Sequence, residues 1–271
     1  MNMRLETNLR GAAARAYVRV VGANRELSWL LFEVAMPVLG TAAYVFIYRA
    51  LEAPREYLGF VVLGGAMTAY WLNVLWAMAS QFYWERQSGI LETYMVTPIS
   101  LMSILLGMAV GGMFQTSLRA LSVWSLGSLI FGVTYQISHP WLGVGVFLVT
   151  LAALYGLGML FASVFLLYGR EAWHLSNLLQ EPIYLVSGFY FPVKALGIWV
   201  AVLASFIPLT LGLDALRQVF FGGTSHGFLS PWLEAGLLTF LAALFILSAR
   251  RALIHMEWLA KREGRLTLKW Q

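Results

Sequence analysis

Residues 85–100 read ERQSGILETYMVTPIS and form a polar stretch between two long apolar blocks. The preceding block, Tyr57 to Ser80, has no charged residue, and neither has the following block, Leu101 to Leu118. A bilayer core about 30 Å thick is crossed by roughly 20 apolar helical residues, so both blocks are long enough to span it. We therefore expect residues 81–100 to form a short loop at one membrane face, with more charge than a simple turn requires.

The composition is that of an integral membrane protein. Of the 271 residues, 60% are hydrophobic and only 11% are charged, whereas soluble domains carry about 25% charged residues. The absence of cysteine excludes disulfides, thiolate metal sites and cysteine nucleophiles. The net charge is +5, but most Lys and Arg residues lie near the two termini and not on one basic face. We therefore expect no nucleic-acid binding, and the positive-inside rule places both termini in the cytoplasm.

Apolar blocks long enough to cross a membrane recur along the chain. Five of them are clear, at residues 28–48, 57–80, 101–127, 141–168 and 232–249. Between the last two lie two more apolar stretches, 172–191 and 195–221, which Pro192 and Lys194 separate. Seven spans would place the two basic termini on opposite sides of the membrane. We therefore expect that one of these two stretches does not cross.

The second stretch is the one expected to remain at the outer face. It contains Pro208, which interrupts a helix, and the charged Asp214 and Arg217 near its end. A charge in the bilayer core costs about 2.5–3.5 kcal/mol on insertion scales. Residues 187–222 are therefore predicted to form re-entrant helices between spans 5 and 6, buried in protein or lining water. The predicted fold is an all-α integral membrane protein, with six transmembrane helices in one domain over residues 28–249.

Residues 1–27 are predicted to form a separate amphipathic interfacial helix. Its apolar face would hold Leu5, Leu9, Ala12, Ala13, Ala16 and Val20, and its polar face Arg4, Asn8, Arg15 and Arg19. Such a helix lies along the cytoplasmic headgroups; the alternative is a partly ordered tail that only fixes the topology. The apolar block that follows is too long for a signal peptide, so we expect no cleavable one. Residues 250–271 are expected to form a basic cytoplasmic tail.

The polar stretch itself has the pattern of a short amphipathic helix. Apolar Ile90, Leu91, Tyr94 and Met95 alternate with charged residues, Gly89 interrupts the pattern, and Pro98 disfavours helix at Thr97. A helix of this kind can insert into a groove of a soluble partner, burying its apolar face and using its carboxylates for orientation.

This stretch resembles the type-2 permease subunits of ABC exporters, in which the loop between spans 2 and 3 reads E-R-x-x-G-x-L-E-x-x-x-x-T-P. The sequence matches this motif at Glu85, Arg86, Gly89, Leu91, Glu92, Thr97 and Pro98. A second match of the family lies at Pro182, Ser187, Gly188, Tyr190, Phe191 and Pro192. A third lies at Pro208, Leu213, Asp214, Ala215, Leu216 and Arg217. The three motifs follow the family's order across most of the chain.

The resemblance implies a cytoplasmic coupling helix, built around residues 85–98, that docks on a separate ATPase subunit. It implies an assembly of two ATPase copies with two permease chains, here expected as a homodimer in contact with membrane lipid. The sequence contains no G-x-x-x-x-G-K-[ST] stretch. We therefore expect that this chain binds no cofactor and is not itself an enzyme, and that ATP and Mg are held by the partner. The expected location is the cytoplasmic (inner) membrane of a prokaryote.

The function implied by the resemblance is ATP-driven export of a drug-like or lipid-like amphiphile from the cytoplasm or the inner leaflet. Residues 187–221 would form the outer gate, with Ser187, Gly188, Phe189, Tyr190, Phe191 and Pro192 at its centre. One alternative is export of a lipid-linked polysaccharide by the same architecture. A membrane-embedded enzyme or a scaffold is the alternative from another class, although the charged residues are scattered singly and form no catalytic cluster.

Three charged residues, Glu33, Arg119 and Glu181, fall within predicted spans. An ionisable residue inside a membrane is a functional candidate by default. We expect Arg119 and Glu181 to approach each other. The alternative is that Arg119 extends outward along its stem while Glu181 caps a bend at Pro182. The G-x-x-x-G at Gly107 indicates a close helix–helix contact.

Two other patterns are weak. Residues 223–227 match G-x-S-x-G, but they lie in a polar loop between apolar helices, where the nucleophile-elbow motif has no meaning. The four histidines show no H-E-x-x-H spacing, so we expect no metal site.

Overall fold

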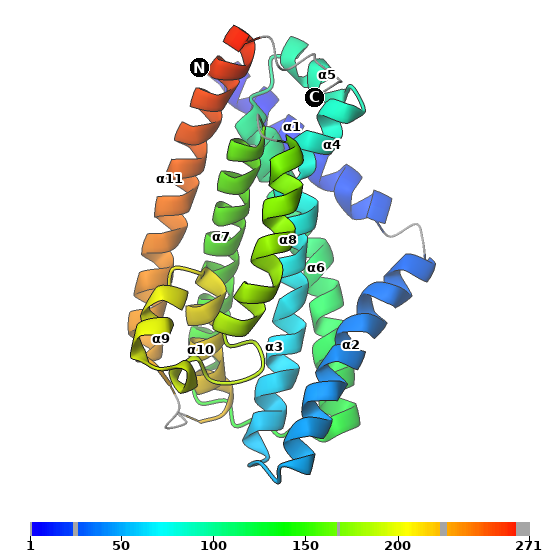
Figure 1. Ribbon diagram of the computed structural model, residues 1–271. Helices are drawn as coiled ribbons and strands as arrows, with labels where there is room; N and C mark the ends of the chain where they lie inside the picture. The colour runs from blue at the N-terminus through cyan, green and yellow to red at the C-terminus, as the bar shows by residue number, and fades with distance from the viewer. Residues whose placement is uncertain (1, 24–26, 167–168, 223–226, 264–271) are drawn as a thin grey trace.

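The computed structural model describes residues 2–23, 27–166, 169–222 and 227–263, and within these ranges every regular element is a helix (Figure 1). The elements are α1 (Asn2–Ala23), α2 (Leu27–Ala50), α3 (Glu56–Leu72), the π-helix η1 (Asn73–Ala79), α4 (Gln81–Gln87), α5 (Ile90–Val96), α6 (Leu101–Phe131), α7 (Pro140–Phe165), α8 (Gly169–Val186), the 3₁₀-helix η2 (Val193–Leu196), α9 (Ile198–Ala204), α10 (Pro208–Phe220) and α11 (Pro231–Glu263).

Within the described residues, five segments are long and apolar enough to cross a membrane, which confirms the all-α membrane fold. The first is Leu31–Ala50 in α2, and the second is Glu56–Gln87, which includes α3, η1 and α4. The third and the fourth are α6 and α7, and the fifth is Pro231–Ala260 in α11. The pair α9 and α10 also has a suitable composition and would be a sixth span, but the two helices meet at 111°. Pro208 starts α10 at this bend, since proline is accepted in the first turn of a helix.

The predicted fifth span, residues 172–191, corresponds to α8. This helix ends at Val186 after 18 residues and is not among the five apolar segments. Figure 1 shows α8 beside α7, leading from one end of the bundle toward α9 and α10. The number of spans is therefore five or six by composition, and the expectation that residues 172–191 cross while residues 195–221 do not stays a prediction.

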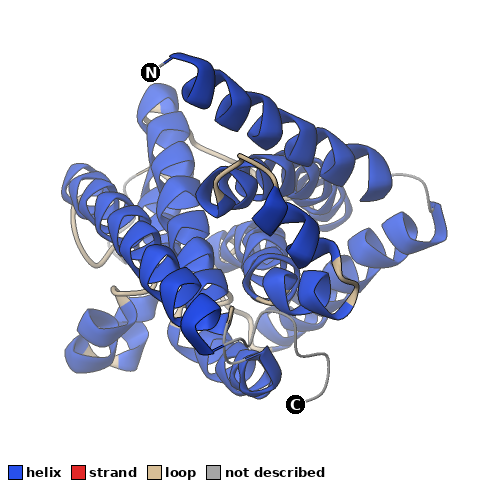
Figure 2. Cartoon of the chain, turned by 90° about the horizontal axis from the view of Figure 1, so that it is seen from above, coloured by secondary structure: helices blue, strands red, loops and turns tan. Residues whose placement is uncertain are grey.

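The two ends of the bundle carry different elements. Helices α1, α4, α5 and the C-terminal end of α11 lie at one end, which we call the α5 end (Figures 1 and 2). The connections between α2 and α3 and between α6 and α7 lie at the opposite end, with α10 close to them (Figure 1). The first and the last described helix therefore meet at the same end, as an even number of crossings requires.

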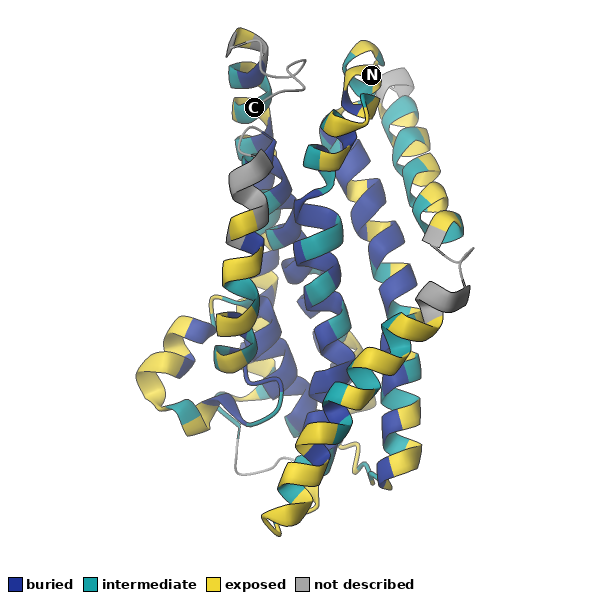
Figure 3. Cartoon of the chain, turned by 45° about the vertical axis from the view of Figure 1, so that its right-hand side comes forward, coloured by how far each residue is buried: buried dark blue, intermediate teal, exposed yellow. Residues whose placement is uncertain are grey.

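The core forms around α3, η1 and α7, whose side chains are mostly buried, whereas α2 is mostly exposed (Figure 3). Large apolar side chains cover the outer faces of the bundle, including Leu129, which is 81% exposed, and Trp141, which is 87% exposed. In a soluble protein an exposed surface of this kind would promote association. In a membrane it meets acyl chains.

Helix α1 packs on α6 through glycine, which explains the G-x-x-x-G pattern. A Cβ at Gly107 would come within 2.3 Å of the Ala12 carbonyl oxygen, and one at Gly111 within 2.8 Å of the Ala16 carbonyl oxygen. The face of α1 that meets the bundle is therefore its small and basic face, while Leu5 and other apolar residues stay exposed. Close approach of this kind is the usual reason for small residues between membrane helices.

Candidate functional site

The polar stretch 81–100 folds as two short helices joined by a sharp elbow. Helix α4 continues the long helix of α3 and η1, and Gly89 then adopts a φ of +76°, which glycine tolerates without strain. Helix α5 follows and ends before Pro98, with Thr97 in the extended conformation that a following proline favours. The Ser100 side chain then accepts a hydrogen bond from the Ser103 amide at 3.2 Å and caps α6.

Glu85 points into the protein and not out toward a partner. Its side chain is only 2% exposed and forms an ion pair with Arg15 of α1. Gln81 Nε2 donates to Glu85 Oε1 at 3.0 Å, and the Tyr94 hydroxyl donates to the same oxygen at 3.2 Å. Burial, followed by the Glu85 charge, raises the pKa of Tyr94 to about 12, so Tyr94 remains a donor at neutral pH. Glu85 therefore connects α1, α4 and α5.

The other motif residues divide between the two sides of the elbow. Leu91 is fully buried, whereas Glu92 and Pro98 are exposed and Arg86 is half-buried. Three apolar side chains of α4 and α5 are also exposed: Trp84 is 50% exposed, Ile90 43% and Val96 85%. The outer surface of α4 and α5 thus combines apolar area with one carboxylate, and we call these residues (Trp84, Ile90, Glu92 and Val96) the α5 surface.

The outer motifs meet at one arginine. Arg217 of α10 is buried and donates hydrogen bonds to the carbonyl oxygens of Phe189 at 2.7 Å, Phe60 at 3.1 Å and Phe191 at 3.2 Å. Its guanidinium also lies 5.1 Å from the centre of the Phe60 ring. The hydrogen bonds of Arg217 therefore connect the third family motif to the second motif and to α3.

The turn that carries Phe189 fits closely against α3. Gly188 has a φ of +70°, and a Cβ at Gly64 would lie 1.6 Å from the Phe189 carbonyl oxygen. Tyr190 stacks on Tyr44 with ring centres 3.7 Å apart. The predicted gate residues, Ser187, Gly188, Phe189, Tyr190, Phe191 and Pro192, thus form a compact turn held between α2, α3 and α10.

Asp214 orders the start of the segment that leads to α11. Its carboxylate accepts a hydrogen bond from the Phe228 amide at 2.7 Å and one from Gln218 Nε2 at 3.0 Å. Gln218 Nε2 also donates to the Leu229 carbonyl at 2.7 Å and lies 3.5 Å from Glu234 Oε2. Of the G-x-S-x-G pattern, residues 223–226 lie outside the described residues.

The predicted approach of Arg119 to Glu181 is wrong. Arg119 forms an ion pair with Glu33, because α2 and α6 pack against each other on one side of the bundle. Glu181 lies on α8, which packs on η1 and α7, and its side chain is exposed and accepts from the neighbouring Gln180 amide at 3.2 Å. The sequence identifies Glu33 and Arg119 as charged residues within spans, but it does not show that they are partners.

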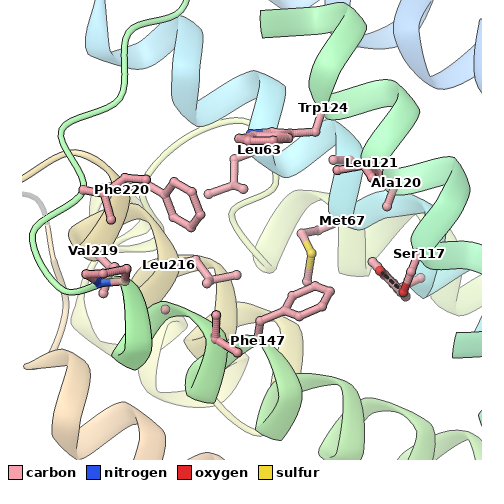
Figure 4. A pocket seen from close by; sticks show the side chains of 16 residues that line it. Leu63, Met67, Ser117, Ala120, Leu121, Trp124, Phe147, Leu216, Val219 and Phe220 are labelled. Carbon is pink, nitrogen blue, oxygen red and sulfur yellow. Dashed lines mark hydrogen bonds between the residues drawn. The ribbon is translucent and has the colours of Figure 1, made fainter. Parts of the chain in front are cut away.

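An apolar pocket of about 440 Å³ opens between α3, α6, α7 and α10 (Figure 4). The side chains of Met67, Leu121, Trp124, Phe147 and Leu216 line it. Ser117 is a polar group at its edge, and its hydroxyl accepts a hydrogen bond from Tyr70 at 2.7 Å. The pocket is therefore suited to hydrocarbon.

Comparison with protein families decides the family of this chain. The family model for ABC-2 type transporters matches residues 20–221, well over half of the sequence. The chain belongs to this family. It is therefore a membrane component of an ABC transporter, and the match includes all three motifs together with α2 to α10. Comparison with curated proteins and with solved structures found no match.

Several residues at these ABC-2 sites escaped the sequence analysis. The sequence assigns Arg15 and Arg19 to the polar face of α1, and in the structure both contact the bundle, Arg15 at Glu85 and Arg19 at the Ala77 carbonyl. The signal that could have located them is the small residues Ala12 and Ala16 next to them, at the spacing of the G-x-x-x-G of α6. Gln218 gave no signal, because its role depends on a loop that returns to α10.

Proposed function

We propose that this ABC-2 protein is the permease subunit of an ATP-driven exporter and that the α5 surface docks on a separate ATPase subunit. The observation that carries the proposal is the elbow at Gly89, which turns α5 across one end of the bundle and exposes Glu92 and Val96 while burying Leu91. An exposed valine beside a carboxylate fits insertion into a groove on a soluble partner. Two permease chains, as a homodimer, would act with two ATPase copies that bind ATP and Mg.

A mechanical route leads from the α5 surface to the outer turn. Helices α3, η1 and α4 form one continuous segment, Glu56–Gln87, with Glu85 at one end and Phe60 near the other. Movement of α5 reaches this segment through Leu91 and the Glu85–Tyr94 hydrogen bond. At the other end, Arg217 connects Phe60 to the outer turn. A displacement of the segment therefore moves the proposed gate.

ATP can drive this movement only through a difference in affinity. ATP must bind one arrangement of the ATPase pair more tightly than another, and the docked α5 must favour one arrangement of the permease in the same way. We propose that the closed ATPase pair favours the permease arrangement that opens outward. The cargo would then be a drug-like or lipid-like amphiphile, for which the apolar pocket of Figure 4 supplies a hydrocarbon-binding wall.

The proposal also fixes an orientation in the membrane. The α5 end would face the cytoplasm of a prokaryote, with both chain termini on that side of the inner membrane, because a soluble ATPase must reach the α5 surface. The excess of Lys and Arg toward the two termini supports the same orientation by the positive-inside rule.

Co-purification with the cognate ATPase tests the proposal. The full chain and the ATPase would be expressed together, isolated in a neutral detergent and assayed for ATP hydrolysis with a panel of amphiphiles. We expect Glu92→Lys combined with Val96→Asp to abolish the complex. The matched control is Glu56→Lys, since Glu56 is an exposed glutamate at the opposite end of the bundle. Equal complex formation by the double variant and the control would refute docking through α5.

A further inference from the structure

A second cavity, of about 630 Å³, lies between α2, the α3–η1 segment and α6, and α1 contributes to its wall. Its volume is within the range of small-molecule sites, about 300–1,000 Å³. Unlike the apolar pocket, it brings together polar side chains from four elements: Arg19, Glu33, Asn73, Gln115 and Arg119. The π-helix η1 starts at Asn73, and π-helical turns inside membrane or soluble helices frequently occur at functional sites.

The charges of this cavity do not balance. Arg119 is paired with Glu33, whereas Arg19 forms no ion pair within the described part of the chain. Among the described residues Arg19 makes two hydrogen bonds, and both are long: 3.4 Å to the Ala77 carbonyl and 3.5 Å to Gln81 Oε1. Burial lowers the pKa of the Arg19 guanidinium, but an arginine remains charged at neutral pH. The cavity therefore carries about one net positive charge.

Hydrogen-bond donors of the cavity also remain unused. The Nε atoms of Arg19 and Arg119 are buried without a partner among the described residues. Gln115 is only 5% exposed and adds a side-chain amide to the lining of the cavity. Leaving buried donors unsatisfied costs free energy. A ligand with acceptor oxygens would remove that cost.

Glycine allows these groups to converge. A Cβ at Gly112 would come within 2.8 Å of Asn73 Oδ1, 3.2 Å of the Tyr155 ring and 3.5 Å of Arg19 Nε. The Tyr155 hydroxyl donates to Asn73 Oδ1 at 3.0 Å and holds that side chain in place. The polar side of the cavity is thus built from groups that are packed closely and fixed, as a binding site requires.

The cavity extends from the start of one apolar segment toward the middle of another. Phe32, Glu33 and Met36 belong to the first turns of the segment Leu31–Ala50. Gln115 and Arg119 lie 14 and 18 residues after Leu101, near the middle of the 31-residue α6. An anionic group bound here would therefore lie beside α1 at the start of α2 and contact the middle of α6.

We propose that this cavity binds the anionic phosphate or carboxylate group of an amphiphile, with Arg19 as its main counter-charge and Gln115 as an additional donor. The hydrocarbon part would lie along Phe32 and Met36, which line the same cavity and are about half exposed. That the bound amphiphile is the cargo rests on the proposed export function. The binding itself does not rest on it.

Binding of dodecyl phosphate to the full chain in neutral maltoside micelles tests the proposal. We expect Arg19→Gln to weaken binding about tenfold, as for the loss of one charge-assisted hydrogen bond. Arg19→Lys should retain most of the affinity. Glu33→Gln should tighten binding, because it removes the negative charge that pairs with Arg119. The matched control, Arg10→Gln, alters an arginine whose side chain is 80% exposed and should leave binding unchanged.

Each outcome has a defined meaning. Equal binding by Arg19→Gln and wild type would overturn the proposal. Weaker binding by Glu33→Gln would overturn it as well, because an anion site requires this variant to bind more tightly. Damage to the fold cannot produce tighter binding. If inorganic phosphate displaces dodecyl phosphate, the site is one for a soluble anion. If inorganic phosphate does not displace it, the site is one for a lipid-like anion. Intact ATPase docking without amphiphile binding would refute this site alone. Amphiphile binding without ATPase docking would refute the proposed function alone.

Discussion

The ion pair between Arg15 and Glu85 should be energetically coupled, because it fastens α1 to the α4–α5 elbow. The Glu85 side chain is 2% exposed and that of Arg15 is 20% exposed. Replacing Arg15 by Met leaves a buried carboxylate without its counter-charge. Replacing Glu85 by Gln leaves a guanidinium that can still reach water. The two single changes should therefore differ in cost.

The structure sets the size of these effects. Breaking a buried ion pair by removing one partner costs about 3–5 kcal/mol, and Arg15→Met should fall at the lower limit because Gln81 and Tyr94 still donate to Glu85. Glu85→Gln should cost about 1 kcal/mol, the value of an ordinary hydrogen bond. The double variant should also cost about 1 kcal/mol, because no buried charge is left. The interaction energy of the pair is then about 3 kcal/mol.

Equilibrium unfolding of all four proteins in mixed micelles, followed by tryptophan fluorescence, measures this interaction energy. Distant sites are additive within about 0.3–0.5 kcal/mol. An interaction energy below that limit would refute the coupling of α1 to the elbow through Glu85.

Three further perturbations test other parts of the structure. Arg217→Lys should lower the free energy of unfolding by about 2 kcal/mol, since a single ammonium cannot serve three carbonyls in a fixed fork; an unchanged unfolding midpoint would contradict this. Gly107→Val should detach α1 and expose it to protease, because its Cβ would meet an α1 carbonyl at 2.3 Å, whereas Gly40→Val, with nothing within 4 Å, should not. Tyr94 has a pKa raised from 10 to about 12, so its contribution to stability is complete below pH 10 and is lost as pH rises to 12. Tyr94→Phe should abolish that part of the alkaline fall in thermal stability, and an identical pH profile for the variant would count against it.

The apolar segments and the interruption at Gly89 could be predicted because their signals are local. A run of about 20 apolar residues is enough to identify a membrane span. Gly89 and Pro98 restrict the backbone at their own positions, whatever packs against them. The bend before α10 follows from Pro208 in the same way. These features need no knowledge of what packs against them.

The partners of the charged residues could not be predicted, because they depend on how the helices are arranged. Arg15 meets Glu85 across 70 positions of sequence, and Arg119 meets Glu33 because α2 lies on that side of α6. Glu181 lies on α8, which packs on η1 and α7, and its side chain is exposed. The packing of α1 on α6 was also hidden. The hydrophobic pattern groups Leu5 with Ala12 and Ala16 on one face, whereas the glycines of α6 contact the two alanines and Leu5 stays exposed.

Site-specific cross-linking would show directly whether α5 docks on the ATPase. The chain contains no cysteine, so Val96→Cys introduces one reactive group into an otherwise unreactive protein. Trp141→Cys is the matched control, because Trp141 is as exposed as Val96 but lies at the opposite end of the bundle. A short bifunctional reagent should join the ATPase to the Val96→Cys protein and not to the Trp141→Cys protein. A cross-link at residue 141, or none at residue 96 in an intact complex, would contradict the account.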